Sequence, residues 1–212
     1  MPAVTALEPD PRGSGGVVVF LDGASYALVA AADVPALGLA VGAALAAPEV
    51  QRLEQRSESF AARAAALRIL AFRALPSTEI QRRLVRKGYA KAAADEAVGA
   101  LVASGLISDV EFARHFARTR ARRFRYGPGR LARDLRRLGI APAEAERAVR
   151  GALADEGVDP LELLREAAAR KLATLEDLDL ASRRRRLKTY LLRRGFAAAD
   201  VIEVVKAALA AS

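Results

Sequence analysis

The chain has 212 residues, 52% of them apolar and 28% charged, which is enough apolar material for several small hydrophobic cores. It has no cysteine, which excludes disulfides and thiolate chemistry, and its one histidine, His115, has no carboxylate cluster at metal-ligand spacing. We therefore predict a protein that is not an enzyme and that holds no metal or cofactor.

The net charge of +9 is unevenly distributed along the chain. It amounts to −4 over residues 1–62, +5 over 63–108, +7 over 109–150 and +1 over 151–212. The middle of the chain should therefore attract nucleic acid or an acidic protein surface. The alternative is a set of arginine-rich helix faces that meet only solvent.

Residues 1–16 are predicted to be a flexible tail. They lack the basic region and apolar core of a secretory signal. Their glycine-rich run, Gly13 to Gly16, lacks the lysine and the serine or threonine of a phosphate-binding loop, so we assign it to the tail.

Residues 17–58 are predicted to form a small N-terminal module that contains a β-hairpin and a linking helix. Two apolar runs, Val17–Leu21 and Ser25–Val29, flank Asp22-Gly23, a pair typical of tight hairpins. Because two strands alone are marginally stable, the hairpin should pair with a short strand near Leu39–Val41 or pack on a helix.

The weakly charged stretch Ala24–Ala47 is not predicted to cross a membrane, because it is rich in alanine and contains proline, glycine and aspartate. A helix from about Glu49 should lead into a longer one, Ser59–Ala74, ended by Pro76. The expected buried face of the longer helix consists of Phe60, Ala64, Leu67 and Leu70.

One pattern then occurs three times: an amphipathic basic helix closed by glycine and a bulky apolar residue. The copies end at Gly88-Tyr89, Gly139-Ile140 and Gly195-Phe196, at intervals of 51 and 56 residues. This spacing indicates tandem units of three short helices, each closing its own cluster and leaning on its neighbours. Each glycine should stop its helix in the left-handed conformation.

Alignment on the glycines brings apolar residues into register at four further positions, namely eight and four residues before the glycine and ten and fourteen after it. The four columns are Ile80, Leu131 and Leu187; Leu84, Leu135 and Leu191; Val98, Val149 and Val205; and Val102, Leu153 and Leu209. Positions eight and four before glycine share one helix face, which must be buried.

The predicted fold is therefore mainly α: a tandem array of three three-helix units in an elongated chain, preceded by the hairpin module. The three units are residues 59–108, 109–157 and 158–212. Their expected helices after the first are Thr78–Lys87, Lys91–Ser104, Asp109–Arg125, one starting near Pro128, one ending near Leu172, Ser182–Arg194 and Ala197–Ala210. Ser108 and Asp159 are expected to cap helix starts.

The arginines are as periodic as the leucines, and they are predicted to form the binding surface. Six and two residues before the glycine stand Arg82 with Arg86 and Arg133 with Arg137, about 200° round the helix from the leucine face. The third unit keeps only Arg193. A second basic stripe at helical spacing consists of Arg114, Arg118, Arg122 and Arg125, with Phe112, Phe116 and Phe124 expected on its buried side. Arg130 extends this surface across the turn, and Lys87 precedes the first glycine.

Three further features allow two interpretations each. Tyr126 could stack on a base at the edge of the basic row, although a tyrosine beside a Gly-Pro turn more often packs the joint. The run Arg183–Arg186 at a helix start indicates either an external anion or a solvated face. His115 is expected to be a surface or boundary residue rather than a functional one.

Several of these segments resemble the RecX family, regulators of the bacterial recombinase RecA. The resemblance covers about residues 63–210, and the N-terminal module is similar to an extra region that some members carry. Leu138 stands where the other two units have a basic residue before glycine. The matching segments are Lys87-Gly88-Tyr89, Asp109–Arg114, Tyr126-Gly127-Pro128 with Arg130-Leu131, Leu138-Gly139-Ile140 and Leu191–Phe196.

The resemblance implies a cytoplasmic, monomeric, non-enzymatic modulator that lies along the RecA filament on single-stranded DNA. It would inhibit ATP hydrolysis and strand exchange in recombinational repair and the SOS response. Duplex DNA stays open as a further partner. We expect the basic contact surface to comprise Arg82, Arg86, Lys87, Arg114, Arg118, Arg122, Arg125, Tyr126, Arg130, Arg133 and Arg137.

Two other functions compete with this one. A helix-turn-helix transcription regulator would read duplex sites with a basic helix, preferring one site by roughly a thousandfold or more. A scaffold with no nucleic-acid role would bind neither DNA nor recombinase.

Overall fold

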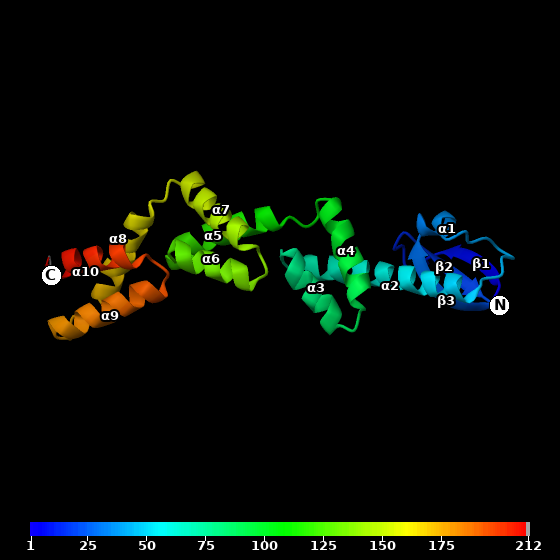
Figure 1. Ribbon diagram of the computed structural model, residues 1–212, viewed down its shortest axis with the longest axis horizontal. Helices are drawn as coiled ribbons and strands as arrows, with labels where there is room; N and C mark the ends of the chain where they lie inside the picture. Colours follow the sequence, from blue (N-terminus) through cyan, green and yellow to red (C-terminus); the bar gives the residue numbers. More distant parts are fainter. Residues whose placement is uncertain (211–212) are drawn as a thin grey trace. The chain divides into compact units, whose positions relative to one another are not determined.

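The computed structural model describes residues 1–210, and the chain divides into two compact units, Met1–Ile107 and Ser108–Ser212. The described residues form ten helices and one three-stranded sheet (Figure 1). The mainly helical class, with a small N-terminal β module ahead of three-helix groups, is as predicted.

The first unit begins with an antiparallel sheet of strands β1 (Val4–Pro9), β2 (Gly16–Leu21) and β3 (Ala24–Ala30), in that order. The predicted hairpin turn is confirmed, since Asp22 and Gly23 join β2 to β3 with φ of 49° and 85°. Those angles match the primed turn that suits the right-handed twist of paired strands.

Strand β1 corrects two expectations. Residues 1–16 are not a flexible tail, because β1 pairs antiparallel with β2. The partner of the hairpin is therefore this earlier strand, whereas residues 39–41 form no strand and only Ala44 makes an isolated bridge, to Ala3. The composition is misleading here because an edge strand tolerates a terminal proline such as Pro9. The glycine-rich run belongs to the loop between β1 and β2.

Two helices follow the sheet, the short α1 (Asp33–Ala36) and the long α2 (Ala47–Leu70). The predicted break near residue 58 is absent, and α2 runs unbroken from the sheet to the first three-helix group (Figure 1). Its first half packs on β3 and buries Leu53 in the sheet core, which confirms that the hairpin packs on a helix.

The second half of α2 buries Ala62, Ala65 and Ala66, whereas Leu67, expected on the buried face, is 41% exposed. Small side chains let α4 approach α2 closely, so the alanines rather than the leucine define the packed face. The helix also ends at Leu70, before the expected Ala74.

Helices α3 (Ser77–Arg86) and α4 (Lys91–Ala103) complete the first three-helix group with α2. Ile80, Leu84 and Val98 are buried in its core as predicted. Val102 is 47% exposed, and Leu101, one position earlier, is buried in its place. Leu101 packs in the core that α4 forms with α2. The repeat column that contains Val102 therefore does not mark a core residue in this unit.

The second unit contains two further groups, α5 (Asp109–Phe124), α6 (Pro128–Arg137) and α7 (Pro142–Asp155), then α8 (Pro160–Leu172), α9 (Leu180–Arg193) and α10 (Ala198–Ala210). The expected caps are present: the Ser108 hydroxyl accepts from the Glu111 N–H and the Asp159 carboxylate from the Leu161 N–H. The two groups share one continuous hydrophobic core instead of closing separately.

All three repeat glycines adopt the predicted left-handed conformation, with φ of 96° at Gly88 and Gly139 and 82° at Gly195. In each repeat the N–H after the glycine donates to the carbonyl of the second leucine column. The N···O distances are 3.2 Å for Tyr89 to Leu84, 3.2 Å for Ile140 to Leu135 and 3.5 Å for Phe196 to Leu191. This is the Schellman stop that the repeated motif predicts.

Among residues 1–210, no helix is both long enough and apolar enough to cross a membrane.

Candidate nucleic-acid and protein interface

The arginine pair on α3 faces outward, as predicted. Arg82 and Arg86 have side chains 52% and 70% exposed, and Lys87, the residue that caps the helix, is exposed as well. Ile80 and Leu84, on the opposite side, are fully buried. The α3 face is defined here as Arg82, Arg86 and Lys87.

A carboxylate lies within the α3 face. Glu79 is hydrogen-bonded by Arg83, with 2.8 Å between Nε and Oε1, and it lies 3.9 Å from Arg82 and 3.8 Å from Arg86. The hydrogen bond from Arg83 lowers the pKa of Glu79, and the charges of Arg83, Arg86 and Arg82 lower it further against an opposing effect of burial. Part of the positive potential of this helix is therefore neutralised locally.

The corresponding pair on α6, Arg133 and Arg137, is also exposed. Here the acidic residue is Asp134, which lies 3.7 Å from Arg130, one turn earlier on the helix. Within the described residues Arg133 has no ion-pair partner. The α6 face, Arg133 with Arg137, therefore contains one arginine that has no carboxylate partner in residues 1–210, whereas both arginines of the α3 face lie within 4 Å of Glu79.

The expected stripe on α5 is divided between different partners. Arg118 and Arg122 both pair with Glu156, the residue that follows α7, and Arg114 lies 3.8 Å from Glu111 on its own helix. Arg125 leaves the helix with φ of 50°. The four arginines do not form one continuous row, because the carboxylates of the second unit bind them in separate places.

Arg125 instead joins the last two repeats. Its Nε donates to Oε2 of Glu166 on α8, at 2.8 Å, and its side chain is 22% exposed. Of the three aromatic residues expected on the buried side of α5, Phe112 and Phe116 pack against the core and Phe124 does not. Ala113, Ala117 and Ala121 are the buried residues, Phe112 and Phe116 are half-buried against the core, and Phe124 is 40% exposed.

Tyr126 packs where the second and third repeats meet. This is the packing role that a tyrosine beside a Gly-Pro turn indicates, the alternative to stacking on a base. Its half-buried ring packs on the core, with the Arg130 guanidinium carbon 3.8 Å and that of Arg194 5.6 Å from the ring centroid. Two of the predicted contact residues, Tyr126 and Arg130, thus already contact each other.

The joint itself is a close approach of two backbones. The Gly127 N–H donates to the carbonyl of Arg194, at 2.8 Å, and the Gly129 N–H donates to that of Gly195, at 3.0 Å. A Cβ at Gly127 would lie 2.7 Å from the Gly195 oxygen, and one at Gly195 would overlap the backbone nitrogen of Arg130. Only glycine permits this contact. The sequence indicated a tight turn at Gly127-Pro128 but not its partner.

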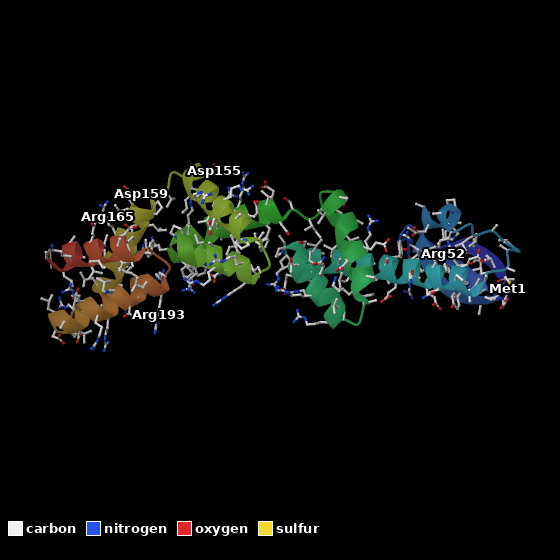
Figure 2. All side chains as sticks on the ribbon, in the orientation of Figure 1. Met1, Arg52, Asp155, Asp159, Arg165 and Arg193 are labelled. Atoms are coloured by element: carbon white, nitrogen blue, oxygen red, sulfur yellow. The ribbon has the colours of Figure 1, made fainter. Side chains whose placement is uncertain are left out.

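The arginine run at the start of α9 also receives an explanation. Arg183 donates to the backbone carbonyls of Leu178 and Glu176, so it closes the preceding loop. Asp179 caps the helix, and its hydrogen bonds from Ser182 lower its pKa. This anion at the helix start offsets the unfavourable arginine charges. Farther along α9, Arg193 is exposed at the C-terminal end (Figure 2).

His115 is exposed on α5, with 3.5 Å between its Nε2 and the Thr119 hydroxyl. The surface position is as predicted. Within residues 1–210 no group of three histidine, cysteine or carboxylate side chains could hold a metal ion.

Comparison with known proteins agrees with this architecture. Models of the first, second and third three-helix domains of RecX match residues 62–101, 108–149 and 158–205. The regulatory protein RecX of Pelodictyon phaeoclathratiforme is 31% identical over 131 residues, 62% of this chain and 78% of that protein. The RecX of Chlorobium limicola is 35% identical over 135 residues, 64% of this chain and 81% of that protein.

Two solved structures share the fold at 20% identity. A crystal structure of regulatory protein RecX gives a TM-score of 0.80, covering 97% of this chain and 99% of that one. RecX from Lactobacillus salivarius gives 0.61, covering 70% and 95%. With the three domain matches in order and relatives above 30% identity over most of their length, the chain belongs to the RecX family of regulatory proteins.

Proposed function

We propose that this protein is a non-enzymatic regulator of a RecA-type recombinase. It binds as a monomer in the cytoplasm along the recombinase filament on single-stranded DNA, and it suppresses ATP hydrolysis and strand exchange. Membership of the RecX family supports the class of partner. The basic faces of the first two repeats support the mode of binding.

The observation that carries the proposal is the repeated orientation of the arginine pairs. In α3 and α6 the leucine columns are buried, and the arginines six and two residues before glycine are exposed. A guanidinium on a helix held by a packed core loses little conformational freedom when it binds. It can donate two parallel hydrogen bonds to a phosphate or a carboxylate. The two faces therefore suit a filament that offers both DNA phosphates and acidic side chains.

Of the predicted contact residues, we keep Arg82, Arg86, Lys87, Arg133 and Arg137 as the main binding set. Arg114, Arg118 and Arg122 form a secondary set, because they lie outside the repeated pairs of α3 and α6 and are divided between Glu111 and Glu156. Arg125, Tyr126 and Arg130 contribute chiefly by holding the last two repeats together.

The helix-turn-helix regulator is less well supported. Such readers insert the N-terminal end of the second helix into the major groove. In the second repeat that end, Pro128 and Gly129, lies against Gly195 of the third repeat, which occupies the space a base edge would need.

The test is RecA ATPase on single-stranded DNA, measured with increasing amounts of the protein. We expect inhibition by the wild type and its loss in Arg82→Glu/Arg133→Glu/Arg137→Glu. Arg150→Glu provides a control that reverses an exposed charge on α7 outside the set. Unchanged inhibition by the triple variant would refute the assignment of these faces, and absence of inhibition by the wild type would refute the proposed function.

A further inference from the structure

Aromatic rings and cations alternate across the joint between the second and third repeats. The Arg123 guanidinium carbon lies 5.3 Å from the centroid of Phe124, which stacks on Tyr126 with centroids 5.5 Å apart and planes 23° apart. We call the whole set the ring-cation row. It comprises Arg123, Phe124, Tyr126, Arg130, Arg194, Tyr190 and Lys171.

The inner members of the row have a structural role. Arg194 lies 4.6 Å from the centroid of Tyr190 and 5.6 Å from that of Tyr126, and it donates hydrogen bonds to the carbonyls of Phe124 and Arg125. It therefore satisfies carbonyls at the end of α5 that the helix itself leaves unpaired. These contacts bind the two repeats to each other.

Phe124 differs from the inner rings. It is 40% exposed at the last residue of α5, with only the Arg123 guanidinium beyond it in the row, whereas Tyr126 and Tyr190 are half-buried. The α5 core is made by alanines, so the Phe124 ring is not needed to fill it. A large ring held in a stacked orientation at a surface is the arrangement that accepts a further planar group.

The charge around Phe124 limits the kind of planar group. Two carboxylates that contact the neighbouring arginines are engaged, Asp134 with Arg130 at 3.7 Å and Glu166 with Arg125 at 2.8 Å. Arg123 has no ion-pair partner among the described residues. The surroundings therefore favour an anion beside the ring. An acidic peptide would satisfy the arginine but would not explain a stacked ring, and a duplex would hide its bases.

We propose that Phe124 is a stacking platform for one base of single-stranded DNA. The base takes the place of the Arg123 guanidinium over the ring, and Arg123 turns to bind the phosphate of that nucleotide. The inference rests on the proposed function, because it assigns a base contact to the protein when it acts on the DNA of the filament. It adds a site that the arginine faces do not include. Stacking is tolerant of sequence because every base has a flat face.

The chain contains no tryptophan, so a single introduced tryptophan reports on one position. Full-length Phe124→Trp is titrated with an oligothymidylate and with an abasic oligomer of equal length and charge. We expect the thymidylate to quench the fluorescence and the abasic oligomer to leave most of it. Phe72→Trp is the matched control, since Phe72 is 89% exposed in the first unit. It should show no difference between the two oligomers.

Affinity for the thymidylate, from the anisotropy of a labelled oligomer, provides the second measurement. Phe124→Leu keeps an apolar side chain, and its folding is checked by thermal unfolding. We expect it to bind about five- to hundredfold more weakly than the wild type, which is the range for loss of one stacked base. Arg123→Gln should reduce the slope of log affinity against log salt concentration by about 0.7, the value for one phosphate contact with a single strand.

Equal quenching by both oligomers, or unchanged affinity of Phe124→Leu, would overturn the platform. So would failure of the wild-type protein to bind the thymidylate at all. These outcomes are separable from failure of the proposed function, which is read from RecA ATPase. A protein that inhibits the ATPase through its arginine faces but shows no stacking at position 124 would retain the proposed function and lose this site.

Discussion

Helices α3 and α6 occupy the same place in successive repeats, and they carry the same charge in different arrangements. Each has four basic residues and one acidic residue between its first residue and the residue before the glycine. The order is reversed, with Glu79 followed by Arg83 in α3 and Arg130 followed by Asp134 in α6. In α3 the carboxylate lies within 4 Å of three arginines, whereas in α6 the carboxylate of Asp134 lies 3.7 Å from Arg130. Equal net charge on two helices therefore does not mean that equal positive charge is available to a binding partner.

A second difference concerns how the helix start is held. The start of α6 lies against the backbone of Gly195, so a side chain at position 195 should displace α6. We expect Gly195→Ala to destabilise the second unit by roughly 4 kcal/mol or more, because the Cβ would overlap the backbone of Arg130. Gly157→Ala in the same unit is the control, since its φ is also positive, at 60°, but no atom lies within 4 Å of the Cβ position, and about 1–2 kcal/mol is expected. Chemical unfolding monitored by circular dichroism measures both, and equal losses would contradict the anchoring of α6.

Because Arg133 has no carboxylate partner within the described residues, α6 should bind single-stranded DNA more strongly than α3. We expect Arg133→Gln/Arg137→Gln to lower the salt dependence of single-stranded DNA binding by about 1.4 log units, two phosphate contacts. Arg82→Gln/Arg86→Gln should lower it by less, because Glu79 already competes for those arginines. Titrations at several salt concentrations provide the slopes. An equal or larger effect from the α3 pair would reverse the ranking.

Removal of the competing carboxylate should raise the DNA affinity of the α3 face toward that of the α6 face. Glu79→Gln keeps the side-chain shape but releases the charges of Arg82, Arg83 and Arg86. We expect single-stranded DNA affinity to rise about two- to fivefold, in line with the small worth of exposed ion pairs. Asp95→Asn, which removes only the carboxylate beside Lys91 on α4, serves as the control. Unchanged affinity would show that Glu79 does not limit the α3 face.

The smallest expected effect is on stability at acid pH. Hydrogen bonding by Arg83 lowers the pKa of Glu79 below its ordinary value of 4.5. The carboxylate therefore stabilises the folded state above about pH 4.5, and this contribution is lost as the pH falls through the lowered pKa. Thermal unfolding from pH 6 to pH 3 should show a smaller decline for Glu79→Gln than for the wild type. Parallel declines would contradict the role given to Arg83.

The repeat architecture was predictable because its evidence lies within each helix. Ile80, Leu131 and Leu187 are buried and Gly88, Gly139 and Gly195 are left-handed, as short-range spacing indicates. Strand β1 was missed because pairing with β2, rather than its own composition, makes it a strand. The exposure of Val102 was missed for a similar reason, since the direction from which α2 packs decides which residue of α4 is buried.

The candidate site was predictable only in part. The outward arginine pairs of α3 and α6 follow from helix geometry. The division of the α5 stripe depends on Glu156 and Glu166, which are distant in the sequence from the arginines they bind. The ring-cation row likewise joins residues of α5 and α9 some 70 positions apart. The only local signal for it was the Phe124-Arg125-Tyr126 sequence beside the Gly-Pro turn.

The central claim is that the repeats inhibit a recombinase through their basic faces, with α6 as the stronger one. Its most direct test is a titration of RecA ATPase on single-stranded DNA with the wild type, Arg133→Gln/Arg137→Gln and Arg82→Gln/Arg86→Gln. The account predicts inhibition by the wild type, the largest loss of potency in the α6 variant and a smaller loss in the α3 variant. Equal potency of all three proteins would contradict it.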